Sequence, residues 1–98
     1  MFKTGEVITR KLQNFNDHEL SPGCVDIRYF RLLISISSIS NQKLRSALEA
    51  VLVNGMSRKE ACTNFNVNQG YFSVKYSHLQ FVNQTVIRMA IYIKNDFN

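Results

Sequence analysis

Apolar residues recur at spacings of three and four through residues 24–39, a pattern typical of a helix that is buried on most of its sides. The end of this segment is ambiguous, because Ile34-Ser35-Ile36-Ser37 alternates with the period of a strand. The preceding dozen residues favour a helix throughout. Pro22, the only proline, marks the boundary before it, either in the first helical turn or in a turn just ahead of it.

A second helix is predicted from Ser40 or Asn41, either of which can cap its start, to Val53. Asn54-Gly55 follows, and a glycine at this place commonly ends a helix in the left-handed conformation. Four apolar residues share one face of this helix and are expected in the core: Leu44, Leu48, Val51 and Leu52.

Ala50 and Val53 fall on the opposite side of the same helix. Two interpretations are open. Single exposed apolar residues are normal on protein surfaces and need no explanation. Alternatively, Ala50 and Val53 form a small patch where two copies of the chain meet, which makes them the candidate oligomer interface.

The segment from Ser57 to Leu79 has the pattern of two helices joined by a tight turn. Ser57 and Glu60 have capping-box spacing, which predicts a helix that begins at Arg58. Asn66 tolerates the left-handed conformation of a sharp turn, and Asn68 suits the cap of the second helix. Each helix has an inward apolar face: Ala61, Cys62 and Phe65 in the first, and Phe72, Tyr76 and Leu79 in the second. The pattern predicts a helix-turn-helix at residues 57–79.

The residues after Leu79 predict an amphipathic helix, with an apolar stripe at Val82, Val86, Met89, Ala90 and Ile93. Because no glycine or proline intervenes before Lys94, this helix either continues the second helix of the motif or folds back onto the first. Ile87, Ile91 and Tyr92 lie off the stripe, and this surplus apolar surface indicates self-association.

Residues 1–20 show no sustained period and are expected to be a mobile N-terminal arm before a helical domain at residues 21–95. The short alternation at residues 7–10 permits a brief strand, but an isolated strand would have no partner there.

Two blocks of the sequence resemble the PapB-like family of adhesin-biosynthesis regulators, small bacterial DNA-binding proteins that control fimbrial operons. One block is Ser57-Arg58-Lys59-Glu60-x-Cys62 with Asn68-x-Gly70-Tyr71-Phe72-Ser73. The other is Leu20-x-Pro22-Gly23 with Phe30-x-Leu32-Leu33-Ile34-x-Ile36-Ser37-Ser38-Ile39. After Ser73 the chain departs from the family pattern at Lys75, Tyr76 and His78.

The resemblance implies an all-helical fold, which supports a helix over residues 24–39. It also implies binding to A·T-rich DNA upstream of fimbrial genes by several protomers, with functional weight at the position of Cys62. The sequence thus predicts an all-α small bundle that contains the helix-turn-helix.

Composition agrees with a DNA-binding domain. The chain has 98 residues, enough for one small domain, and its net charge of +5 and pI of about 9.5 indicate an anionic partner. No apolar run approaches a membrane span and the N-terminus lacks a secretion signal, so a cytoplasmic location is expected. The resemblance implies that this cytoplasm is bacterial and that the protein is nucleoid-associated. The cysteines and histidines are too scattered for a metal site, and neither a cofactor nor a small-molecule ligand is indicated.

A helix-turn-helix presents the start of its second helix to the major groove. Amide side chains at Asn68 and Gln69 can pair with adenine, although Asn68 alternatively serves only as a cap. Gly70 lowers helix propensity, which we interpret as close approach to DNA, and Arg58 and Lys59 oppose the helix dipole in a way that phosphate contact explains. The candidate DNA-binding residues are Arg58, Lys59, Cys62, Asn68, Gln69, Gly70, Tyr71, Ser73, Val74, Lys75 and Ser77.

Two of these residues have structural alternatives. The Cys62 thiol would pack the two helices together, and Lys75 would cover the packed face with its stem.

The leading hypothesis is a DNA-binding regulator of a fimbrial or adhesin operon that acts as a homo-oligomer. The alternative is a helical adaptor that binds another protein and whose basic charge is incidental. No residues place a nucleophile beside a base, so an enzyme is not expected.

Overall fold

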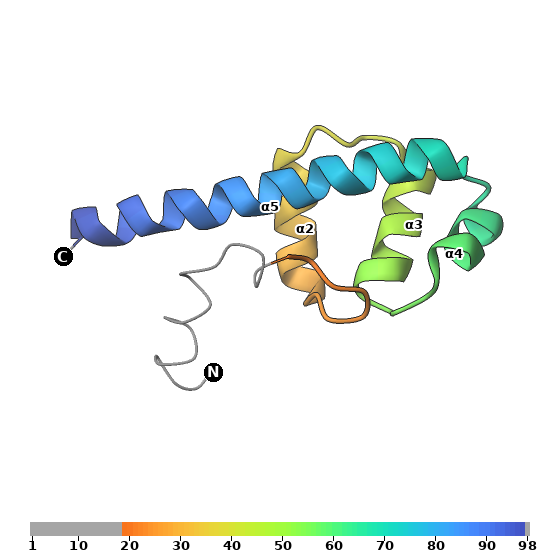
Figure 1. Ribbon diagram of the computed structural model, residues 1–98, viewed down its shortest axis with the longest axis horizontal. Helices are drawn as coiled ribbons and strands as arrows, with labels where there is room; N and C mark the ends of the chain where they lie inside the picture. The colour runs from red at the N-terminus through yellow and green to blue at the C-terminus, as the bar shows by residue number, and fades with distance from the viewer. Residues whose placement is uncertain (1–18, 98) are drawn as a thin grey trace.

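The computed structural model describes residues 19–97, with side chains as far as Lys94. This part of the chain is all-α, as predicted, with α5 lying across α2 and α3 and with α4 at one end (Figure 1). Residues 1–18 of the arm predicted at residues 1–20, including the possible strand at residues 7–10, lie outside the described residues. The helices are α2 (Ile27–Ile36), α3 (Gln42–Leu52), α4 (Arg58–Phe65) and α5 (Gln69–Phe97).

Helix α2 is shorter than predicted at both ends because local hydrogen bonds set its limits. The Asp26 carboxylate caps the start by accepting from the Arg28 amide at 2.7 Å. At the other end the Ser37 hydroxyl donates to the Ile34 carbonyl at 2.9 Å, and Ser38 takes a left-handed conformation with φ 67°. Residues 34–36 are helical, so the strand alternative for this segment is wrong.

Helix α3 begins at the predicted cap, with the Asn41 side chain accepting from the Leu44 amide at 2.9 Å. The apolar stripe predicted for the core is buried, and Gly55 has a φ of 82° just after the helix. The expected surface patch on the opposite side is wrong, because Ala50 is only 3% exposed. The chain turns back toward α4 along this side of α3, where the Met56 amide donates to the Ala50 carbonyl at 2.9 Å. Val53 is half-buried against the core.

The folded domain begins earlier than residue 21. Leu20 is buried in the core, and its backbone is held by the side chain of Gln80 on α5. The Gln80 amide oxygen accepts from the Leu20 N–H, and its nitrogen donates to the Leu20 carbonyl, both at 2.8 Å. Leu20, which the sequence assigned to the arm, therefore belongs to the domain.

Helix α5 is continuous, so the predicted C-terminal helix continues the second helix of the motif. Its middle packs on the core through Val82, Asn83 and Val86, and its C-terminal part projects beyond α2 (Figure 1). In that projecting part Met89, Ala90 and Ile93, predicted for one packed stripe, are exposed. Within residues 19–97 no helix has the length and apolarity needed to cross a lipid bilayer.

Candidate nucleic-acid interface

Helices α4 and α5 are joined by a tight turn whose caps match the sequence prediction. The Ser57 hydroxyl accepts from the Glu60 amide at 3.1 Å, which fixes the first turn of α4. Asn66 ends α4 in the left-handed conformation, with φ 56° and ψ 52°. The Asn68 side chain then accepts from the Tyr71 amide at 3.0 Å and starts α5. These local bonds fix where α4 begins and where α5 begins.

The inward faces of the two helices pack together as the spacing predicted. Ala61 and Cys62 are buried, Phe65 is half-buried, and Val67 in the turn packs against the same core. From α5 the buried residues are Phe72, Tyr76 and Leu79. The helix-turn-helix prediction is confirmed, and its geometry leaves the opposite side of α5 exposed.

Five of the eleven predicted DNA-binding residues present exposed side chains on the first turns of α5. Tyr71 is 43% and Val74 is 65% exposed, and the neighbouring polar residues are exposed as well. The exposed side chains of the first turns of α5 are Gln69, Tyr71, Ser73, Val74 and Ser77. Tyr71, Ser73, Val74 and Ser77 lie away from the packed face, whereas Gln69 is exposed as the first residue of α5.

Asn68 and Gly70 have a structural explanation. A Cβ atom on Gly70 would lie 3.1 Å from the Asn68 side-chain oxygen, the atom that caps α5. Glycine therefore leaves room for the cap. This corrects the interpretation that Gly70 needs close approach to DNA to explain it, and it shows that the Asn68 oxygen already has a partner.

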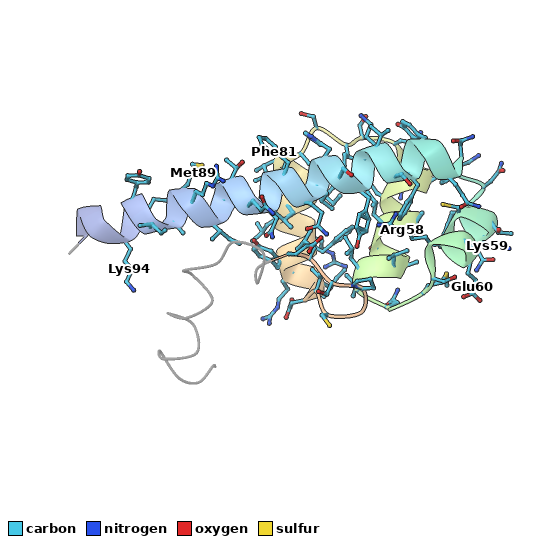
Figure 2. The ribbon with its side chains drawn as sticks, viewed as in Figure 1. Arg58, Lys59, Glu60, Phe81, Met89 and Lys94 are labelled. Atoms are coloured by element: carbon cyan, nitrogen blue, oxygen red, sulfur yellow. The ribbon has the colours of Figure 1, made fainter. Side chains whose placement is uncertain are left out.

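Arg58 lies against α5. Its guanidinium carbon is 4.2 Å from the centroid of the Tyr76 ring and 6.0 Å from that of Phe72. In Figure 2, Lys59 and Glu60 lie on the outer side of α4, whereas Arg58 lies on the side that faces α5. Sequence reasoning missed the contact between Arg58 and Tyr76, because it joins two helices and no local pattern indicates it.

Cys62 is packed inside the motif. It is 3% exposed, and burial raises the pKa of its thiol, an effect that the nearby positive charge of Arg58 partly offsets. The thiol does not reach the surface, so Cys62 is wrongly placed among the DNA-contacting residues. Its alternative role, packing α4 against α5, holds.

The charge of this surface is positive. The sequence has no Asp or Glu between Ala61 and Lys94. Lys75 is half-buried, which agrees with its predicted position beside the packed face. Its ammonium nitrogen lies 5.8 Å from the Tyr71 ring centroid. Arg58, Lys59 and Lys75 are the cations of the motif, and Glu60 is its single carboxylate.

His78 links α5 to the end of α2. Its Nε2 donates to the Ser37 carbonyl at 2.9 Å. Sequence reasoning missed this role, because the bond joins residues 41 positions apart in the chain.

Other candidate sites lie away from the motif. A hollow of about 350 Å³ is lined only by residues of α2 and α3, among them Phe30, Arg31, Arg45 and Glu49. Among residues 19–94, no three His, Cys, Asp or Glu side chains are grouped closely enough to hold a metal ion. The motif of α4 and α5 is therefore the best-supported site in the described part of the chain.

Comparison with known proteins identifies the chain's relatives. Residues 4–93 match the family model PapB, described as adhesin biosynthesis transcription regulatory protein. The chain is 38% identical over 96 residues to the regulatory protein FanB of Escherichia coli, covering 92% of this chain and 97% of FanB. It is also 38% identical over 95 residues to the pilus subunit operon regulatory protein PapB of Escherichia coli, covering 93% of this chain and 91% of PapB.

A solved structure agrees with the sequence comparison. The crystal structure of Escherichia coli FocB superposes with a TM-score of 0.71 at 37% identity, covering 91% of this chain and 98% of FocB. The resemblance seen in the two sequence blocks is thus confirmed over most of the chain. The chain belongs to the PapB family of adhesin biosynthesis transcription regulatory proteins.

Proposed function

We propose that this transcription regulator binds double-stranded DNA through residues 57–79, with the start of α5 at the base edges and α4 across the phosphate backbone. The observation that carries the proposal is the exposed side of α5. It combines amide, hydroxyl and aromatic side chains, and no carboxylate occurs from Ala61 to Lys94 to repel a phosphate. Neither α4 nor α5 needs to move to present this side.

The side chains divide into two groups by the contacts they can make. Arg58, Lys59 and Lys75 carry the positive charge and contact phosphates. The side chains available to the bases are Gln69, Tyr71, Ser73, Val74 and Ser77. Asn68 and Gly70 shape the start of α5.

Salt-dependent binding tests this assignment. Affinity for an A·T-rich duplex, followed by fluorescence anisotropy, should fall as salt rises, and each lost phosphate contact should reduce the log–log slope by about 0.9. Arg58→Ala should weaken binding and lower the slope. Arg31→Ala is the matched control, because it removes an exposed cation from α2. Binding that does not depend on salt, or an Arg58→Ala variant that behaves like the control, contradicts the assignment.

We further propose that the target is A·T-rich control DNA of a fimbrial or adhesin operon. The relatives include the regulatory protein of the AFA-III adhesin operon, 41% identical over 71 residues. The Gln69 amide can pair with adenine, and groove shape in A·T-rich DNA adds selectivity without base contacts. Affinities for A·T-rich and G·C-rich duplexes of equal length test this preference, and equal affinities argue against it. Such a protein works at the chromosome, in the bacterial cytoplasm.

Binding as a homo-oligomer remains part of the proposal, but at another surface. Ala50 is buried and Val53 half-buried, so these two residues offer little surface to a second copy. The projecting part of α5 is exposed and apolar on several sides, at Met89, Ile91, Tyr92 and Ile93. A helix that is apolar around its circumference is typically covered by neighbours.

Sedimentation velocity tests the oligomer. Ile91→Asp should shift the wild-type distribution toward the monomer, whereas Ser40→Asp, an equal charge change in the exposed loop before α3, should not. A wild-type chain that stays monomeric at all concentrations, with and without DNA, contradicts this part of the proposal. Salt-independent capture of a protein partner in place of DNA would favour the adaptor alternative.

A further inference from the structure

Tyr76 presents a fixed aromatic face at the junction of the two helices. It is 7% exposed, and its ring packs on Phe72 with centroids 5.7 Å apart and an interplanar angle of 36°. Phe72 is buried in turn. The Tyr76 ring therefore has little freedom to reorient.

Arg58 lies over this face while remaining exposed. Its guanidinium carbon is 4.2 Å from the Tyr76 centroid, within the range of a cation–π contact. Its backbone is fixed as well, because Arg58 follows Ser57, the residue that caps α4. Both ends of this long side chain are thus held.

The stack leaves the hydrogen-bonding edge of the guanidinium without a partner among residues 19–94. A guanidinium presents all five of its N–H donors in its plane, whereas an aromatic ring contacts its face. Among the described residues, the salt bridge found is that of Arg28 with Asp26, and Arg58 has none. A phosphate oxygen pair can therefore approach the Arg58 edge while Tyr76 holds the face.

We propose that Tyr76 is a positioning residue for DNA binding, whose ring holds the Arg58 guanidinium in the orientation that contacts phosphate. This inference rests on the proposed function, because it assigns the phosphate contact to Arg58. A side chain ordered before binding loses less conformational entropy when it engages its ligand. Removing the ring should therefore weaken DNA binding by about 3-fold to 10-fold, the range expected for one immobilised long side chain.

The test is a double-mutant cycle on the full chain, with anisotropy measured on an A·T-rich duplex across a salt series. Tyr76→Leu should weaken binding about 3-fold to 10-fold, and Tyr76→Phe, which retains the ring, should bind within about 2-fold of wild type. In an Arg58→Ala background, Tyr76→Leu should have no further effect, because the side chain that it positions is gone.

A purely structural role would give different results. Tyr76→Leu would then weaken binding equally with and without Arg58, which overturns the proposal, as does unchanged affinity in Tyr76→Leu. Circular dichroism checks that the variants are folded. Tyr76→Met, which keeps apolar volume, replaces Tyr76→Leu if that variant does not fold.

A second measurement needs no variant. In the NMR spectrum of the free protein, the Arg58 Hδ and Hε protons should show upfield ring-current shifts, and random-coil values overturn the proposal.

If Arg58→Ala binds DNA like wild type, the proposed function fails at this residue and this inference fails with it. If Arg58→Ala weakens binding but Tyr76→Leu does not, only this inference fails.

Discussion

Gly23 and Gly55 pack backbone against backbone, since a Cβ atom on Gly23 would lie only 3.2 Å from the Gly55 Cα atom. Their φ angles are 75° and 82°. Both amides donate to the same acceptor, the Val51 carbonyl, at 3.0 and 3.1 Å. This contact holds the segment before α2 against the end of α3, just before the chain enters α4, so it helps to set where the helix-turn-helix leaves the core.

Alanine at either glycine should destabilise the domain, and more so at Gly23. A positive φ costs an L-residue about 1–2 kcal/mol at both positions. Gly23→Ala adds a close contact with backbone, whereas a Cβ on Gly55 would meet the Gly23 Cα at an ordinary 3.5 Å. Urea unfolding followed by circular dichroism should rank wild type above Gly55→Ala and Gly55→Ala above Gly23→Ala. The reverse order of the two variants would show that the close approach is unimportant.

The two glycines show how far the sequence could predict the fold. The left-handed conformation of Gly55 was predicted, because a glycine after a helix is a local signal. The caps of α4 and α5 at Ser57, Asn66 and Asn68 were predicted for the same reason. Gly23 was not, because what requires it is Gly55, a residue distant in sequence that only the folded chain brings near.

The error at Ala50 has a related cause. Helical spacing shows which residues share a face, but it does not show how many neighbours the helix has. Helix α3 contacts α2, α4 and α5, so sides that seemed opposite are both covered. The contacts of Tyr76 with Arg58 and of His78 with Ser37 were missed likewise, because each joins two helices.

The Asp26 cap of α2 should make the stability of the domain sensitive to acid. Hydrogen bonds from the Arg28 side chain and amide lower the pKa of Asp26 to about 2. This pKa is below that of an unfolded aspartate, which is about 3.9. The ionised Asp26 carboxylate therefore contributes its full stabilisation of the fold above a pH of about 3.9, and this stabilisation is lost as pH falls through about 2. The melting temperature of wild type should therefore approach that of Asp26→Asn, which keeps an acceptor without a charge, as pH falls from about 4 to about 2.

An NMR titration of the Asp26 carboxyl carbon measures the same effect directly. A midpoint near 3.9, the value of an unfolded aspartate, would show that Arg28 does not hold this carboxylate in solution. A difference between the two melting curves that does not change with pH would lead to the same conclusion.

The hydrogen bond from Tyr29 to Asn83 should stabilise the packing of α2 on α5. The Tyr29 hydroxyl donates to the Asn83 side-chain oxygen at 2.5 Å, Asn83 is buried, and burial raises the pKa of Tyr29. Tyr29→Phe should cost about 1–2 kcal/mol in urea unfolding, because a buried acceptor loses a donor. Tyr92→Phe is the matched control, since Tyr92 is 72% exposed, and its stability should be unchanged. Equal stabilities of the two variants would contradict the role of this bond.

The two cysteines should differ in reactivity because only one is accessible. Cys24 is exposed, whereas Cys62 is buried and its raised pKa keeps more of the thiol protonated and unreactive at neutral pH. Ellman's reagent should titrate one thiol per native chain rapidly and the second at least about 10-fold more slowly, at the rate of local opening. In denaturant both should react at once.

The variant Cys24→Ser isolates the buried thiol. Its native form should react only in the slow phase, and reaction at Cys24 in the wild type should leave DNA affinity unchanged, because Cys24 lies before α2 and outside the motif. Slow modification of Cys62 should instead abolish DNA binding together with the helical packing, since the added group cannot fit between α4 and α5. Rapid reaction of native Cys24→Ser would show that Cys62 is at the surface, and would restore it as a candidate for contact with DNA.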